Sequence, residues 1–314
     1  MTAAAAQVGV ALVLGFLVPW GFVHLLVPAL AQGKVTENYR GRQVFLGLGI
    51  VWLVWAGCAI VAGVIGGMLG PGSVLQVFTL AGPLALVAFA LGMVDDALGT
   101  GADRGFKGHF RALAKGRMTT GMLKLVGVGT ASLVVALVVS EFAPWGSEGL
   151  MRGELSAGGI SGVVLATAAI ALTSNFVNLT DLRPGRALKA YSVLALLAAA
   201  LLAFALGGIA PAAPPVQPLD GVATFITAAL MLLGPAAAVL RYDLGELGML
   251  GDAGANPMGA VAGMTIVLTL PLWGLAFYSF ALLALNLASE RVSFSAVIEG
   301  SAPLRWVDRL GRLP

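Results

Sequence analysis

The chain has 314 residues, of which 59% are hydrophobic and only 11% are charged, and its mean hydropathy is +0.95. Because a soluble domain carries about 25% charged residues, this composition predicts an all-α integral membrane protein that crosses the bilayer several times. The formal net charge of +3 does not indicate nucleic-acid binding, because most basic residues lie in short loops between apolar runs. The single cysteine, Cys58, excludes an intramolecular disulfide bond and a structural metal site built from several thiolates.

Eight apolar runs follow one another along the chain. They cover residues 3–30, 44–65, 74–94, 118–139, 156–177, 190–209, 222–240 and 258–288. The last run has 31 residues, and a helix of that length would be about 46 Å long, against a hydrocarbon core of about 30 Å. Pro271 lies near its middle, where it can mark a kink or a tight turn. We therefore expect this run to cross the membrane twice, which predicts about nine transmembrane helices.

The distribution of Lys and Arg favours nine crossings with the N-terminus outside. In that topology 17 of the 18 basic residues lie on the cytoplasmic side, and only Arg152 lies outside. A single crossing by the last run would place four arginines outside, namely Arg291, Arg305, Arg309 and Arg312. Because cytoplasmic loops carry the excess of Lys and Arg, the sequence predicts a cytoplasmic C-terminus.

Residues 289–314 are expected to form a cytoplasmic tail at the end of a single transmembrane domain, residues 1–314. Apolar residues recur in this tail at helical spacings: Phe294, Val297, Ile298, Leu304, Val307 and Leu310. Together with Trp306 and three arginines, this pattern predicts an amphipathic helix that lies on the inner membrane surface and anchors the chain there.

Two adjacent carboxylates, Asp95 and Asp96, end the third apolar run. A charge costs roughly 2.5 to 3.5 kcal/mol at the bilayer centre on insertion scales, and less near the interface. The two carboxylates also repel each other, unless a cation lies between them or their pKa values move apart. This pair therefore predicts a site for a divalent metal or a phosphate at a membrane surface. The predicted topology puts three more carboxylates on the same side, which indicates a shared inner-face cleft: Asp181, Asp243 and Asp252.

A row of polar residues closes the fifth apolar run. Asn175, Asn178 and Asp181 are spaced three residues apart, so they share one face of a helix. Such a row can offer amides to a base or sugar and a carboxylate to a hydroxyl or a cation. Alternatively, these residues only terminate the helix. Arg183 and Arg186 follow, one on each side of a Pro-Gly turn. They either bind a diphosphate with two-point hydrogen bonds or form a basic loop whose charge only determines the membrane topology.

Small residues surround Asp252 in the stretch GDAGAN, residues 251–256. They allow a ligand to approach the backbone and the carboxylate closely, although a structural turn with a capping Asp is the alternative. Near the second apolar run, Arg40 and Arg42 either guide an anionic substrate or hold their loop inside. His109 lies in the basic loop of Lys107, where it can touch a phosphate.

Three motifs stand in an order and spacing that is typical of one family: VDDALG at 94–99, NFVNLTD at 175–181 and GDAGAN at 251–256. With them, from Asn38 to about Gly259, the chain resembles the polyprenyl-phosphate N-acetylhexosamine-1-phosphate transferase superfamily. That group contains the phospho-MurNAc-pentapeptide translocase and the enzymes that load GlcNAc-1-phosphate onto a polyprenyl carrier. Each motif alone is a weak signal, whereas three in register on one predicted face are a strong one.

The resemblance implies a transfer reaction at the cytoplasmic face of a bacterial cytoplasmic membrane, with Mg²⁺ or alternatively Mn²⁺ as the cofactor. Polyprenyl phosphate would attack the sugar-side phosphorus of a UDP-sugar, and UMP would leave. By resemblance, Asp252 would be the Mg²⁺ ligand, and Asp95 and Asp96 would be the catalytic pair; we also expect Asp96 to help hold the metal. Asn175, Asn178 and Asp181 would bind the nucleotide or the sugar, and Lys107 and Lys124 would neutralise phosphates. The residues themselves, rather than the resemblance, add Arg183, Arg186, Arg40 and Arg42 as candidate contacts of the anionic substrate. A homodimer is also expected.

The chain departs from the family pattern in three places. Relatives continue NLTD with GLDGLA, whereas residues 182–189 read LRPGRALK. The family's late histidine-rich loop is missing, because neither His24 nor His109 lies near the C-terminus, and no tenth span is predicted. These departures leave the sugar and the nucleotide open. The alternative functions are a transporter or lipid flippase, and a non-catalytic relative that binds a lipid-linked sugar or a partner protein.

Overall fold

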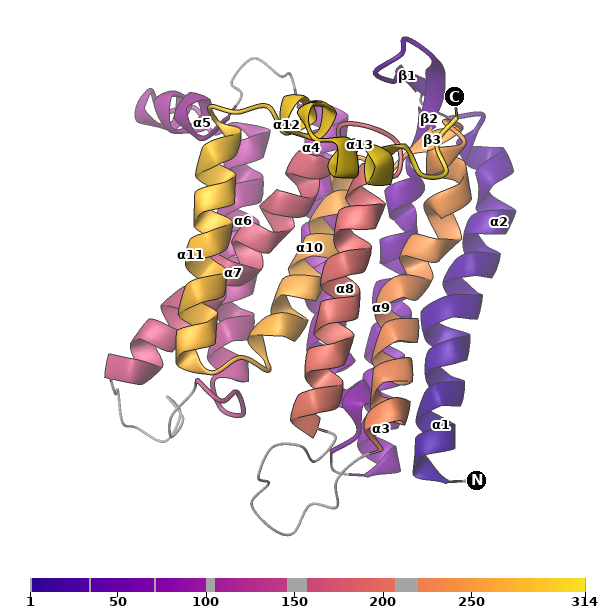
Figure 1. Cartoon of the computed structure of the whole chain (residues 1–314), viewed down its shortest axis with the longest axis vertical. Helices are drawn as coiled ribbons and strands as arrows, with labels where there is room; N and C mark the ends of the chain where they lie inside the picture. Colours follow the sequence, from indigo (N-terminus) through magenta and orange to yellow (C-terminus); the bar gives the residue numbers. More distant parts are fainter. Residues whose placement is uncertain are drawn as a thin grey trace.

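The computed structural model describes residues 2–33, 35–70, 72–99, 105–145, 157–206 and 220–313. Figure 1 shows a bundle of long helices with the N-terminus at one end and the C-terminal tail at the other. The helices of the first half are α1 (Ala3–Val10), α2 (Val18–Leu30), α3 (Val51–Leu69), α4 (Phe78–Leu98), α5 (Gly105–Ala114) and α6 (Thr120–Val139). The second half contains α7 (Ala157–Thr180), α8 (Arg186–Leu206), α9 (Gly221–Leu244), α10 (Asp252–Val267), α11 (Leu272–Ser289), α12 (Phe294–Gly300) and α13 (Ala302–Arg309).

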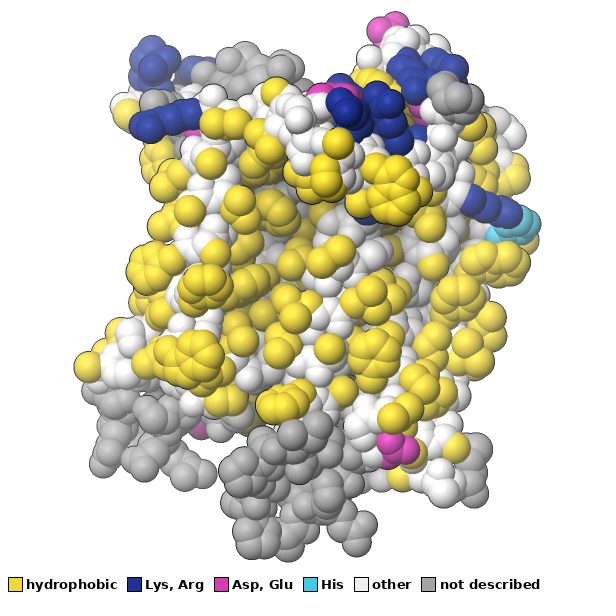
Figure 2. Space-filling model, in the orientation of Figure 1, with side chains coloured by type: hydrophobic (Ala, Val, Ile, Leu, Met, Phe, Trp, Pro, Cys, Tyr) yellow, Lys and Arg dark blue, Asp and Glu magenta, His cyan; other side chains and the backbone are white. Residues whose placement is uncertain are grey.

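Eight helical segments among the described residues are long and apolar enough to cross a membrane. The first, Ala3–Leu30, is continuous because a π-helical stretch, Ala11–Leu17, joins α1 to α2. Figure 2 shows hydrophobic side chains along the flanks of the bundle and Lys and Arg gathered at the end that carries the tail. The predicted all-α membrane fold is confirmed at this level, and the described residues also contain three short strands.

The last apolar run breaks between Val267 and Leu272 into α10 and α11, as the proline predicted. Helix α10 has 16 residues, and all of its residues from Ala253 to Val267 are buried. It lies in the middle of the bundle and joins α11 at the end away from the tail (Figure 1). Because every face of α10 is covered, the packing of this helix fixes the position of its first residue, Asp252.

Glycines let α10 approach its neighbours closely. A Cβ atom added at Gly92 of α4 would lie 2.3 Å from the carbonyl oxygen of Asp252, and one added at Gly259 would lie 2.4 Å from the carbonyl oxygen of Thr173 in α7. No side chain fits at either contact, so the glycines allow backbone to meet backbone. The start of α10 is therefore held directly against the end of α4.

A small sheet joins two distant segments at the tail end of the bundle (Figure 1). Strands β1 (Val35–Glu37) and β2 (Gln43–Leu46) form an antiparallel hairpin, and β3 (Gly248–Met249) pairs with β2 in parallel. This pairing fixes the loop in front of α10 against residues 35–46, which we call the hairpin. The sequence analysis did not predict these strands.

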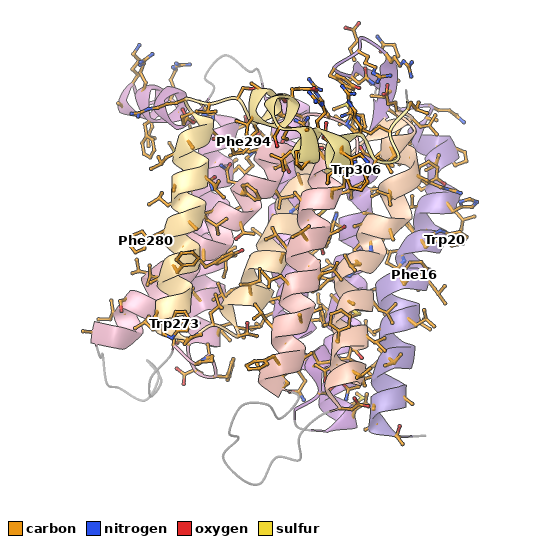
Figure 3. All side chains as sticks on the ribbon, viewed as in Figure 1. Phe16, Trp20, Trp273, Phe280, Phe294 and Trp306 are labelled. Carbon is orange, nitrogen blue, oxygen red and sulfur yellow. The ribbon has the colours of Figure 1, made fainter. Side chains whose placement is uncertain are left out.

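The tail forms two short helices, α12 and α13, in place of the single amphipathic helix that the sequence predicted. Ser301 separates them with an extended backbone. Figure 3 places Phe294 and Trp306 at the tail end of the bundle and Trp273 at the opposite end. The side chains of Trp273 and Trp306 are 78% and 66% exposed, and exposed tryptophans at both ends of a bundle are typical of the two membrane–water interfaces.

Candidate functional site

Lys124 of α6 lies between two carboxylates from distant parts of the chain. Its Nζ donates to Asp95 Oδ2 at 3.1 Å, and it also forms an ion pair with Asp252. All three side chains are largely buried, with 14% of the lysine, 21% of Asp95 and 24% of Asp252 exposed. The ends of α4, α6 and α10 thus bring two negative charges onto one ammonium group.

Asp96 makes contacts that differ from those of its neighbour. Its Oδ1 accepts the backbone N–H of Asp252 and its Oδ2 accepts that of Ala253, both at 3.0 Å. These N–H groups belong to the first turn of α10, where a helix has unsatisfied donors and a partial positive charge. The repulsion between Asp95 and Asp96 is therefore relieved by a lysine on one side and a helix N-terminus on the other.

Asn178 completes the contacts around Lys124. In the amide orientation that satisfies both neighbours, its nitrogen donates to Asp252 Oδ1 at 2.9 Å and its oxygen accepts from Lys124 Nζ at 3.2 Å. Asn175 lies one turn earlier on α7 and donates to Asn286 of α11 at 2.6 Å. The predicted amide row thus divides, with Asn178 at the charged cluster and Asn175 linking two helices beside it.

A cavity of about 220 Å³ opens beside this cluster, and we call it the Lys124 cavity. Its polar wall includes Asp95, His109, Lys124, Asn175, Asn178 and Asn256. Leu125, Val128 and Ala171 form an apolar part of the wall. His109 is held there by Thr119, whose hydroxyl lies 2.8 Å from its Nδ1. The cavity can therefore accommodate a molecule that carries both a charged group and an apolar chain.

Asp181 follows the last residue of α7 and lies behind the cluster. Burial, together with the carboxylates of Asp243, Asp252 and Asp96, raises the pKa of Asp181 well above its usual value, although a backbone hydrogen bond from Gly251 opposes the shift. Its surroundings thus disfavour the charged form of Asp181.

The oxygen atoms at Lys124 are of the type that Mg²⁺ prefers. Asp95 and Asp252 both contact the ammonium group of Lys124. A bound metal cation also requires carboxylates that point towards one position. Both oxygens of Asp96 accept backbone N–H groups, and both oxygens of Asp252 accept from Lys124 and Asn178, so a metal at the expected pair of Asp96 and Asp252 would have to share or replace these contacts. No group of three or more His, Cys, Asp or Glu side chains is placed to hold a metal within the described ranges. Amide oxygens and the substrate's own oxygens would have to complete the shell.

The arginines singled out in the sequence do not line the Lys124 cavity. Arg186 forms a two-point ion pair with Asp308 of the tail, at 2.8 and 3.1 Å, with both side chains about 95% buried. Arg183 pairs with Glu299, also in the tail, whereas Arg40 and Arg42 pair with Glu246. Lys107 lies in α5, but its side chain is outside the described part of the structure.

Several polar residues at the site were not predicted from the sequence: Ser174, Asn256, Ser289 and Glu290 line the cavity, and Asn286 contacts Asn175 beside it. Asn256 lines the cavity and donates to the carbonyl oxygen of Asp252 at 2.8 Å. Asn256 lies four residues, about one helical turn, after Asp252, and this spacing could have predicted that both residues lie on the same face of the helix. Asn286 lies in the apolar helix α11 and bonds the carbonyl oxygens of Leu172 and Leu282. An amide inside a membrane helix is costly unless it is hydrogen-bonded. The presence of Asn286 in an apolar run could therefore have predicted that this residue contacts polar groups inside the bundle.

The fold and this cluster define a polytopic all-α membrane protein with a buried lysine–carboxylate site at one end of its bundle. No protein-family model and no curated protein matches the chain. The chemistry of the site therefore rests on its own residues.

Proposed function

We propose that this protein transfers a sugar-1-phosphate from a nucleotide sugar, UDP-linked, to a polyprenyl phosphate and releases UMP. The observation that carries the proposal is the convergence of Asp95 and Asp252 on Lys124 beside a cavity that has both polar and apolar walls. Phosphoryl transfer brings several negative charges together, so positioning and charge neutralisation supply most of the catalysis. Lys124 provides a fixed positive charge of this kind, and the motifs around it resemble those of the transferase superfamily.

The proposed topology has nine crossings, with α10 as the ninth helix beside the eight longer ones. A helix of 16 residues is about 24 Å long, which is short for the hydrocarbon core but sufficient for a helix covered by protein on all sides. With the tail end of the bundle in the cytoplasm, the basic residues gathered there obey the positive-inside rule (Figure 2). The Lys124 cavity then faces the cytoplasm of a bacterial cell, where nucleotide sugars are made.

In this proposal the residues at the cavity and in the charged cluster beside it have distinct roles. Lys124 neutralises the phosphates, while Asp95 and Asp252 hold its ammonium in place. Asp96 fixes the start of α10 and thereby the position of Asp252. Asn178 and Asn175 orient the nucleotide sugar, with Asp181 as a hydrogen-bonding group behind them.

No general base is required for the attacking group. A phosphate monoester has its second pKa near 6, so polyprenyl phosphate is already largely dianionic at neutral pH. Mg²⁺, or Mn²⁺ in its place, would be held by Asp95, Asp252 and the Asn178 amide and would neutralise charge on the diphosphate. The apolar wall of Leu125, Val128 and Ala171 would hold the first part of the polyprenyl chain.

A release assay tests this proposal. The full chain, purified in detergent, is incubated with polyprenyl phosphate, Mg²⁺ and each of a panel of UDP-sugars, and UMP is measured. We expect UMP with at least one sugar, no UMP after chelation with EDTA, and a loss of three or more decades in rate for Asp252→Asn. Glu37→Gln in the exposed hairpin, which also removes one carboxylate, should leave the rate unchanged. A folded protein that releases no nucleotide monophosphate with any sugar would refute the transferase.

One observation favours a second candidate, a non-catalytic protein that binds a lipid-linked sugar. Lys124 is already paired with two carboxylates, and the described residues offer no cluster of three metal-binding side chains. Such a protein would bind polyprenyl-diphosphate-sugar in the Lys124 cavity without turnover. Saturable binding of added polyprenyl-diphosphate-sugar, together with no UMP release in the assay above, would support this second function.

A further inference from the structure

A second cavity, of about 380 Å³, lies where three segments meet at the tail end of the bundle. The hairpin contributes Tyr39 and Arg40, the turn between α7 and α8 contributes Arg183, and the tail contributes Glu299, Arg309 and Arg312. None of these residues lines the Lys124 cavity. We call this space the arginine cavity. Figure 2 shows Lys and Arg side chains gathered over this part of the molecule.

Among the described residues, arginines outnumber the carboxylates that they pair with around the arginine cavity. Each of three carboxylates contacts two guanidinium groups: Glu246 contacts Arg40 and Arg42, Glu299 contacts Arg183 and Arg309, and Asp308 contacts Arg186 and Arg312. In these ion pairs six guanidinium groups share three carboxylates. This set of groups carries an excess of positive charge, which attracts anions.

Tyr39 brings three of these arginines together. The guanidinium carbons of Arg40, Arg183 and Arg312 lie 5.4, 5.3 and 5.2 Å from the centre of its ring. Arg40 and Arg312 also donate to the Tyr39 hydroxyl. Each contact with the ring is only weakly favourable, and three like charges around one ring repel each other. A bound anion would relieve that repulsion.

Guanidinium groups bind phosphate with two parallel hydrogen bonds, because their planar donors match its oxygens. The volume of the cavity lies within the range of about 300 to 1,000 Å³ that is typical of small-molecule sites, so it has room for more than one phosphate. Arginines from three separate segments can hold several phosphates at once. These features point to a ligand with at least two phosphate groups.

We propose that the arginine cavity is a binding site for an anion with two or more phosphate groups, and that the bound anion joins the tail to the hairpin and the α7–α8 turn. The site is separate from the Lys124 cavity and does not depend on the transferase function. The ligand is either a soluble diphosphate or the headgroup of an anionic lipid in the inner leaflet, since both present the same chemistry to the arginines.

Titration with inorganic pyrophosphate tests the site. The full chain in a neutral detergent is titrated by calorimetry with EDTA present, so that no divalent ion can hold pyrophosphate at Asp252. We expect saturable binding that weakens at least about tenfold in Arg309→Gln, because one charge-assisted contact is lost. Arg309 is 69% exposed and its ion pair with Glu299 is long, at 3.8 Å, so this substitution should not disturb folding.

Two matched variants serve as controls. Arg291→Gln removes the same charge from the tail outside the cavity, and Asp252→Asn alters the Lys124 cluster. Both should bind pyrophosphate like the unchanged protein. Equal affinity in Arg309→Gln, or loss of binding in Asp252→Asn alone, would overturn the proposal, because the anion would then lie elsewhere.

A second experiment, with lipids, identifies the source of the ligand. Nanodiscs of phosphatidylcholine with and without cardiolipin, which carries two phosphates, are compared by the melting temperature of the protein. A rise in melting temperature with cardiolipin that Arg309→Gln abolishes assigns the site to a lipid headgroup. Pyrophosphate binding without such a rise assigns it to a soluble anion. If neither probe binds, the proposal is wrong whatever the transferase assay gives.

Discussion

Asp96 accepts the backbone N–H of Asp252 at 3.0 Å, so the carboxylate of one motif fixes the backbone of another. The same side chain also accepts the N–H of Ala253. Because these two donors open α10, Asp96 acts as a helix cap supplied by a different helix. Its position thus links the structure of the bundle to the position of the Asp252 carboxylate.

This cap predicts a graded response to substitution at Asp96. Asp96→Ala removes both acceptors and should lower the free energy of unfolding by about 2 kcal/mol, whereas Asp96→Asn keeps one acceptor oxygen and should cost about 1 kcal/mol. Thermal unfolding of the two variants in the same detergent measures the difference. If Asp96→Ala melts together with the unchanged protein, the carboxylate does not cap α10.

Lys124 gives the second prediction. Without the ammonium group, Asp95 and Asp252 face each other across the site with no fixed counter-charge. Lys124→Gln should therefore lower the rate of UMP release by about 10²- to 10³-fold, the typical loss for one transition-state donor. The control is Lys115→Gln, which removes the same charge from an exposed position of the loop after α5. A Lys124→Gln enzyme with the full rate would remove Lys124 from the proposed chemistry.

The close contact at Gly259 gives the third prediction. A methyl group there meets the carbonyl oxygen of Thr173 at 2.4 Å, so α10 and α7 must move apart in Gly259→Ala. Overpacking of this kind costs about 1 to 3 kcal/mol. Gly129 lies in α6 with nothing within 4 Å of an added Cβ atom, so Gly129→Ala should be neutral or slightly stabilising. Equal melting temperatures for the two variants would contradict the contact.

The sequence located the membrane helices well, because each apolar run is a property of neighbouring residues. The break at Pro271 and the eight longer spans follow directly from run lengths. The hairpin was not predicted, because its pairing with Gly248 and Met249 joins segments about 200 residues apart by backbone bonds alone. In the tail, the apolar residues fall into two groups, at 294–298 and 304–310, but one amphipathic helix was expected, and the structure separates the two groups at Ser301.

The site could be predicted only in part, because its contacts also join residues that lie far apart in the chain. Asp95, Asp96 and Asp252 end or begin apolar runs on one side of the predicted bundle, and the structure brings them together. Their separate roles depend on what each meets: a lysine for Asp95 and a helix N-terminus for Asp96. Arg186 was assigned to substrate because its partner, Asp308, lies 122 residues later in a tail for which only an anchoring role was expected.

The ion pair between Arg186 and Asp308 gives the last prediction, which concerns pH. Burial opposes ionisation of Asp308, but hydrogen bonds and charge from Arg186, together with the charge of Arg312, outweigh it and lower the pKa of this carboxyl. An acid whose pKa is lower in the folded protein adds stability above its unfolded pKa of about 3.9 and loses it as the pH falls through the folded value. The tail should therefore stay attached at neutral and mildly acidic pH.

Limited proteolysis of the full chain, with a protease active in acid, measures this attachment. We expect residues 290–313 to remain protected from about pH 7 down to about pH 4 and to become accessible only at still lower pH, as the pH falls through the lowered pKa of Asp308. In Asp308→Asn the tail should be accessible at every pH, because a buried Arg186 left without its carboxylate costs about 3 to 5 kcal/mol. Glu37→Gln should behave like the unchanged protein. Release of the tail between about pH 5 and pH 7 would show that a group with a higher pKa than Asp308 holds it.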